Sequence, residues 1–143
     1  MARAAARGDA RREIFLAMHF ATFLWQVQGI KGEAREVLRE ARETHRGSRS
    51  LIQCAVRLEL SQGPPGVPAA RTLYASACAE RSGLGSTDRL ALLQDWADFE
   101  ADRGEDVGAV RALERRMRAL RVDRVRVVLT EVRGPGAKRD VGG

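Results

Sequence analysis

The sequence predicts an all-α fold in which about six helices form antiparallel pairs, stacked as a short α-solenoid of three repeats. Apolar residues recur at helical spacing along most of the 143 residues, and the breaks between these segments are short and contain Gly, Pro or Ser. The pairs also superpose on one another, with 36 and 39 residues between equivalent positions, as expected for a solenoid. Only 5% of the residues are aromatic, which fits a helical array better than a β-sandwich.

The first three helices are expected before residue 62. One apolar segment runs from about 10 to 28 and is closed by Gly29, and a second runs from about 32 to 44. The third segment, from about 50 to 61, stops at the turn 62–66, because its two prolines cannot continue a helix.

The last three helices are expected between residues 68 and 121. The fourth, from about 68 to 81, begins with a proline suited to a first helical turn and ends at the glycine-rich stretch 82–85. The fifth opens with Ser-Thr-Asp, all good N-caps, and spans 86–103, and the sixth spans about 106–121. Residues 122–129 alternate in part like a strand, and three outcomes stay open: they extend the last helix, dock on a groove, or become ordered only with a partner.

The formal net charge of +6 is concentrated at the two ends of the chain. The excess is +3 in residues 1–12 and +3 in residues 121–143, whereas residues 13–120 hold 15 basic and 15 acidic side chains. We therefore expect one repeat domain over 13–120, between a basic N-terminal extension (1–12) and a basic, flexible C-terminal tail (121–143). The tails either contact RNA phosphates or are merely solvated, and the neutral body weakens the case for a dedicated nucleic-acid surface.

The sequence contains no pattern for catalysis or metal binding. His19 and His45 stand without a second ligand at a suitable spacing, and the acidic run 98–106 lacks the Gly and Glu positions of a calcium loop. No Ser or Cys stands in a nucleophile elbow. We therefore expect no enzyme activity, catalytic residue, cofactor, metal or small-molecule substrate. The longest apolar run, 14–27, is too short to span a membrane, so no membrane partner is expected.

Equivalent positions of the three helix pairs carry similar residues. The second helices open with Ala-Arg, Ala-Arg and Ala-Val at residues 34, 70 and 109, and the first helices place large apolar residues on one face, most clearly over 93–100. With the turn at Gly104, this pattern resembles half-a-TPR (HAT) repeats. The resemblance implies a structural role for the matching residues: Trp25, Ala34, Arg35, Leu58, Glu59, Ala70, Arg71, Tyr74, Leu93, Trp96, Phe99, Glu100 and Gly104.

A narrower resemblance concerns the order of these segments. Glu-Ala-Arg-Glu-Val-Leu at 33–38 is followed by the 51–59 helix, a proline-rich insertion, and Trp-Ala-Asp-Phe at 96–99 with Gly-Glu-Asp-Val at 104–107. This order is similar to the C-terminal repeats of the pre-mRNA-processing factor 39 family, scaffold subunits of the spliceosomal particle that recognises the 5′ splice site. The resemblance implies a non-enzymatic splicing scaffold in the nucleus that contacts other subunits of the particle and forms a homo- or heterodimer. The alternative is an RNA-binding HAT-type factor in RNA processing or in organellar transcript stabilisation.

The first helix is apolar around much of its circumference, so it must be buried on more than one side. Phe15, Phe20 and Phe23 on its outer flank are expected to pack on a missing upstream repeat or on a partner chain. The alternative is that residues 1–12 or 122–132 fold back over them.

The sixth helix carries three arginines on one face. Arg111, Arg115 and Arg118 stand at i, i+4 and i+7, a stripe that suits phosphates or an acidic partner. The alternative is the solvated face of an amphipathic helix.

Overall fold

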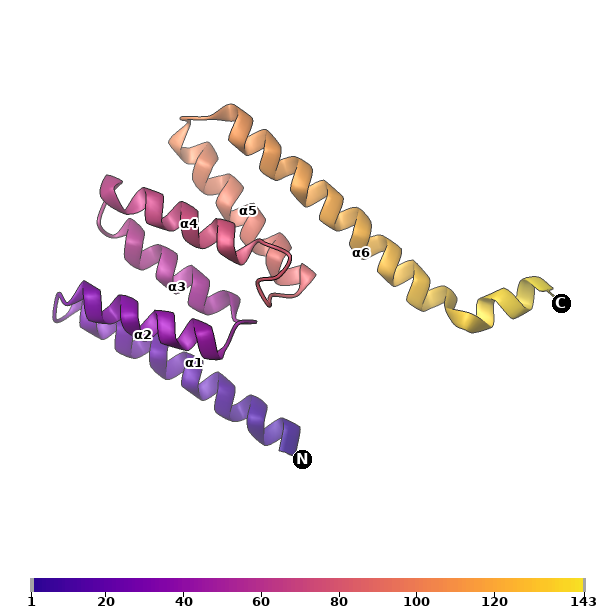
Figure 1. Cartoon of the computed structure of the whole chain (residues 1–143), viewed down its shortest axis with the longest axis horizontal. Coiled ribbons are helices and arrows are strands. Elements are labelled where there is room, and N and C mark those ends of the chain that lie inside the picture. The colour runs from indigo at the N-terminus through magenta and orange to yellow at the C-terminus, as the bar shows by residue number, and fades with distance from the viewer. Residues whose placement is uncertain (1, 143) are drawn as a thin grey trace. The chain divides into compact units, whose positions relative to one another are not determined.

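The protein is all-α over the residues that the computed structural model describes. These are residues 2–142 for the backbone, with side-chain surroundings described for 8–126 and 128–130. This range contains six α-helices, one short 3₁₀ helix and no strand, so the expected all-α fold of antiparallel helix pairs is confirmed (Figure 1). The helices are α1 (Ala2–Gln26), α2 (Lys31–Thr44), α3 (Arg49–Leu60), η1 (Pro64–Gly66), α4 (Val67–Ala77), α5 (Ser86–Arg103) and α6 (Val107–Gly142).

The contacts group the chain into two units, Met1–Arg89 and Leu90–Gly143. The first unit holds α1 to α4 and the first residues of α5, and the second holds the rest of α5 and α6. The single repeat domain over 13–120 stays a prediction.

The core of the first unit forms where α1, α2 and α3 meet. Ala21 and Ala34 are fully buried, and their small side chains let α1 and α2 approach closely. Leu38, Leu51 and Leu58 belong to the same cluster and are among the largest fully buried side chains. Because α3 in turn packs against α4, the four helices form two consecutive antiparallel pairs (Figure 1).

Local signals set both ends of α3. The hydroxyl of Ser48 accepts a hydrogen bond from the Leu51 N–H at 3.4 Å, which caps the start of the helix. After the helix, Gly63 adopts the left-handed backbone conformation (φ 78°) and η1 leads directly into α4. Gly66 approaches α3 so closely that a Cβ there would lie 2.6 Å from the carbonyl carbon of Glu59. The proline-rich insertion is therefore a tight turn that holds α4 against α3.

The second unit contains the third helix pair, in which α5 and α6 lie side by side (Figure 1). The guanidinium of Arg116 on α6 lies over the Trp96 ring of α5, with 5.8 Å between the guanidinium carbon and the ring centroid. Leu113 and Met117 are buried on α6. The turn between the two helices uses Gly104 in the left-handed conformation (φ 66°), for which glycine is favoured.

The first and last helices are longer than the sequence analysis predicts. α1 begins at Ala2 and not near residue 10, and α6 continues to Gly142 and not to about residue 121. Ala and Arg have high helix propensity before residue 10, and no Gly or Pro interrupts residues 109–133. The expected boundaries at residues 12 and 121 therefore lie inside helices, and residues 122–129 extend the last helix.

The fourth helix is shorter than predicted. α4 ends at Ala77, because the Cys78 N–H makes the last helical hydrogen bond, to the Tyr74 carbonyl, and the chain then turns between Ala79 and Ser82. Leu84, beyond this turn, is buried. The loop after α4 is therefore packed against the first unit and helps to shape its surface.

Candidate interaction surfaces

The outer side of α1 carries an exposed apolar stripe. Leu16, Phe20, Phe23 and Val27 are 63, 53, 44 and 71% exposed, and their spacing of four, three and four residues places them on one side of the helix. Phe15 beside them is 60% exposed, and its ring contacts the His19 ring in a tilted arrangement, with 4.1 Å between centroids and 46° between the ring planes. The structure therefore places the three predicted phenylalanines on the surface, each about half exposed.

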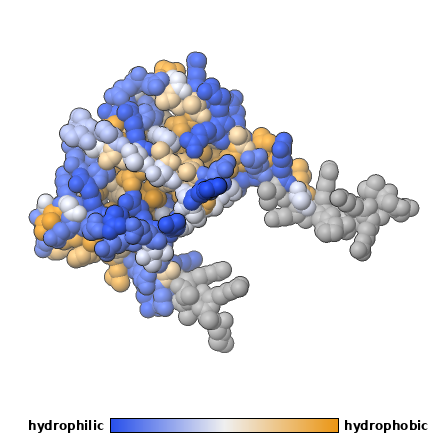
Figure 2. Space-filling model, viewed as in Figure 1, coloured by the Kyte–Doolittle hydropathy of each residue, from blue (hydrophilic) through white to orange (hydrophobic). Residues whose placement is uncertain are grey.

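The opposite side of α1 is what fixes the stripe in this position. Ala21 and Leu24 are buried against α2 and α3, and the partly buried Met18 and Trp25 flank them. At the end of α2, the His45 Nε2 lies 2.8 Å from a carboxylate oxygen of Glu13, which ties α1 to that end. Since α1 cannot turn without breaking this core, its outer apolar side stays exposed; apolar atoms reach the surface over this helix in Figure 2.

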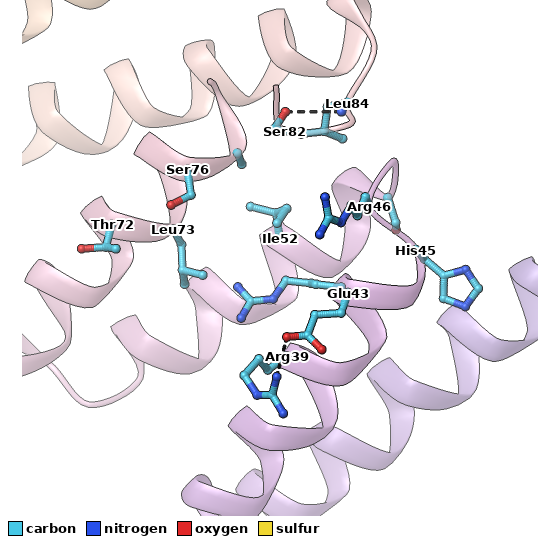
Figure 3. Close-up of a pocket in the computed structure, with 13 residues that line it drawn as sticks. Arg39, Glu43, His45, Arg46, Ile52, Thr72, Leu73, Ser76, Ser82 and Leu84 are labelled. Atoms are coloured by element: carbon cyan, nitrogen blue, oxygen red, sulfur yellow. Dashed lines mark hydrogen bonds and ion pairs between the residues drawn. The ribbon is translucent and has the colours of Figure 1, made fainter. Parts of the chain in front are cut away.

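A cavity of about 410 Å³ lies between α2 and α4, within the first unit. Figure 3 shows Arg46 of the turn after α2, Ile52 of α3, and Leu73 and Ser76 of α4 around this space, which Ser82 and Leu84 of the following loop close at one end. We call it the α2–α4 groove. Its residues are Arg39, Arg42, Glu43, His45, Arg46, Ser48, Ile52, Thr72, Leu73, Ser76, Ala77, Ser82 and Leu84.

The three arginines of the groove differ in their partners. Arg39 bonds to Glu36 and to Glu43, and these bonds and charges raise the pKa of Arg39 and lower that of Glu36. Arg42 is half-buried; burial lowers its pKa, and the charge of Arg39 lowers it further. Neither Arg42 nor Arg46 makes a hydrogen bond or ion pair with another described residue. The groove therefore contains two guanidinium groups without a carboxylate partner.

The sequence analysis missed this groove. Residues 39 and 42 stand at i and i+3 on one face of the second helix, and residue 46 follows in the turn after it, so this group of three arginines is visible in the sequence. The sequence does not show that Thr72 and Ser76 form the opposite wall of the groove, because only the packing of α4 brings them to the same cavity.

The predicted arginine stripe lies where the sequence places it. Arg111, Arg115 and Arg118 are exposed on α6, and none of them forms an ion pair with another described residue. Arg118 also lines a second cavity, of about 390 Å³, between α5 and α6. The stripe is accessible to a ligand, but its three side chains stand on one convex helix face and do not form a concave site.

Most of the repeat-motif residues are structural. Arg35 of α2 and Glu59 of α3 form an ion pair, with the Arg35 Nε 2.6 Å and its Nη2 3.2 Å from the two carboxylate oxygens. This bidentate pair joins the second helix of the first helix pair to the first helix of the next pair. The motif positions that are buried are Ala34, Leu58, Glu59, Ala70, Tyr74, Leu93 and Glu100. Trp25, Arg71, Trp96 and Phe99 are partly buried, and Arg35 and Gly104 are exposed.

Among the described residues, no group of three or more His, Cys, Asp or Glu side chains could hold a metal ion, and the cysteines Cys54 and Cys78 are free and buried. None of the helices in this part of the chain is long and apolar enough to cross a membrane. Comparison of the sequence and fold with protein-family models, curated proteins and solved structures finds no match in any of the three.

Proposed function

We propose that the chain is a non-enzymatic protein-interaction scaffold that self-associates through the outer apolar stripe of α1. One observation carries the proposal: Leu16, Phe20, Phe23 and Val27 form a continuous exposed apolar face on a helix whose other face is already buried. A contiguous apolar patch on the surface of a small protein is typical of a protein–protein contact.

Burial of this stripe would contribute favourably to association. Three phenylalanines that are each about half exposed would remove on the order of 300 Å² from water, which corresponds to about 8 kcal/mol before the costs of association. The spacing of four, three and four residues is also that of a coiled-coil seam, which packs against a like helix. Two copies related by a two-fold axis would each offer the same stripe, so the contact is self-complementary.

The resemblance in sequence supplies the biological setting of the proposal. The HAT-like pattern and its similarity to the pre-mRNA-processing factor 39 family support a role in the pre-mRNA splicing machinery, in the nucleus, with other subunits of the 5′ splice-site-recognising particle as partners. In that role the chain contributes shape and docking surfaces and performs no chemistry.

Light scattering across a dilution series, at low and high salt, tests the self-association. The wild type should be a salt-resistant dimer, and Phe20→Glu with Phe23→Glu should make it a monomer. Val125→Glu with Leu129→Glu is the matched control, because it places the same charges on exposed apolar positions of α6 and should leave the dimer intact. A wild type that is folded and monomeric at every concentration contradicts the proposal.

The second candidate is an RNA-binding HAT-type factor of RNA processing or of organellar transcripts. The exposed and unpaired Arg111, Arg115 and Arg118 favour it, together with the basic ends of the chain. Salt separates the two functions, because a protein that neutralises several phosphates loses affinity steeply as ionic strength rises, whereas an apolar contact does not.

A further inference from the structure

The α2–α4 groove combines apolar and polar walls in a way that the scaffold proposal does not use. Ile52, Leu73 and Leu84 contribute apolar surface, and Leu84 is itself buried. Thr72 and Ser76 stand one helical turn apart on α4 and contribute hydroxyl groups. A concave site of about 410 Å³ with a few polar groups on an apolar lining is of the size and character of ligand sites, which span about 300 to 1,000 Å³.

The charge of the groove is the second observation. Arg39 is neutralised by Glu36 and Glu43, whereas Arg42 and Arg46 form no hydrogen bond or ion pair with another described residue, and the charges of Glu59 and Glu43 act on Arg42 only at longer range. A guanidinium that is partly removed from water gains most from a bidentate contact with a carboxylate or phosphate. The half-buried Arg42 therefore favours an anionic group placed inside the groove rather than at its rim.

We propose that the α2–α4 groove binds an extended acidic peptide segment of a partner protein, with carboxylates on Arg42 and Arg46 and an apolar side chain against Ile52 and Leu73. The hydroxyls of Thr72 and Ser76 would bond to the peptide backbone along the opposite wall. The inference deepens the scaffold function by giving the chemistry of a partner, but it uses a site separate from the outer stripe of α1.

A peptide fits the groove better than RNA does. The acidic Glu36, Glu40 and Glu43 stand among the arginines on α2, and they would repel the evenly spaced charges of a phosphate backbone, whereas a segment with one or two carboxylates can avoid them. Base stacking also requires aromatic side chains, and the single ring of the lining, that of His45, points away toward Glu13 (Figure 3).

Selection from a library of random peptides on the full-length protein provides the probe, and fluorescence anisotropy of the selected, fluorescein-labelled peptide measures its affinity. We expect a consensus with Asp or Glu next to an apolar residue. Arg42→Ala and Arg46→Ala should each weaken binding by about tenfold or more, because each removes a charge-assisted bond. Arg42→Lys should fall in between, since lysine keeps the charge and loses the bidentate geometry.

The matched control is Arg111→Ala with Arg115→Ala, which removes the same charges from α6 and should change the peptide affinity by less than about twofold. Circular dichroism verifies that each variant stays helical. The inference is wrong if no acidic consensus is recovered, or if the α6 control weakens peptide binding as much as the groove variants do. It is also wrong if poly(U) RNA displaces the peptide and the binding of this RNA requires Arg42 and Arg46. The light-scattering experiment on Phe20 and Phe23 is independent of these results, so a failure of the groove does not imply a failure of self-association.

Discussion

The ion pair between Arg35 and Glu59 should hold the first helix pair to the second. The Glu59 side chain is only 9% exposed and receives two bonds from Arg35 and one from the Gln62 amide at 3.1 Å, whereas Arg35 is 44% exposed. Breaking a fully buried pair costs about 3 to 5 kcal/mol and breaking an exposed pair costs about 0 to 1. Because Arg35→Ala would leave a nearly buried carboxylate with one neutral donor, we expect a loss of about 2 kcal/mol, and about 1 kcal/mol for Glu59→Gln.

Urea unfolding followed by circular dichroism measures these losses, and the double variant completes a cycle whose coupling energy should be about 1 kcal/mol. Arg39→Ala is the control, because it breaks two ion pairs of the same type, to Glu36 and Glu43, on the exposed side of α2. It should leave the free energy of unfolding nearly unchanged, because exposed ion pairs contribute little to stability. If Arg35→Ala destabilises the protein no more than Arg39→Ala does, or if the coupling energy is zero, the pair does not join the two repeats.

Substitutions at three further positions test the packing of the first unit by the same unfolding measurement. Gly66→Ala should cost about 1 to 3 kcal/mol, because its methyl group would overlap the Glu59 backbone and force α4 away from α3; an unchanged stability would show that the turn can shift freely. Leu38→Ala should cost about 2 to 5 kcal/mol for the cavity it leaves in the core, so a loss below about 1 would contradict the close packing. Ser48→Ala should cost about 0.5 to 1 kcal/mol through the lost cap of α3, and Ser48→Asp should retain the stability of the wild type.

Helices with a defined stop signal could be predicted from the sequence within one or two residues. α3 begins after the cap Ser48 and ends before the proline-rich turn, and α5 ends before Gly104, where caps and breakers fix the backbone. The outer end of α1 could not be predicted, because Ala and Arg continue a helix without any local signal for its start. α6 continues past Gly134, Pro135 and Gly136, residues that ordinarily end a helix, so local signals alone do not predict its end. Partial alternation in residues 122–129 is compatible with a strand as well as a helix, and no neighbouring strand exists in the described residues to favour the former.

The candidate surfaces were predictable to different degrees. The exposure of Phe20 and Phe23 follows from helical periodicity, since a helix that is apolar on both sides cannot bury both against a single neighbour. The groove was not predictable, because it needs the relative placement of two helices that are distant in sequence. The same holds for the pair of Arg35 and Glu59: the repeat pattern identifies both positions, but only the packing of α2 on α3 brings them together.

The two proposed surfaces lie on different helices of the first unit. α2 directs Ala34 and Leu38 into the core and Arg42 into the groove, which Arg46 of the following turn also lines, while α1 directs its stripe of apolar residues away from the core. Self-association through α1 therefore leaves the groove open in each copy, and a two-fold dimer carries two equivalent grooves. A partner with two acidic segments would bind such a dimer more tightly than a monomer, since the second segment binds at a high effective concentration. The variant Phe20→Glu with Phe23→Glu, which we expect to be monomeric, should keep its affinity for a single acidic segment and lose only the tighter binding of a partner with two segments. This behaviour is expected of a scaffold that acts by geometry rather than by chemistry.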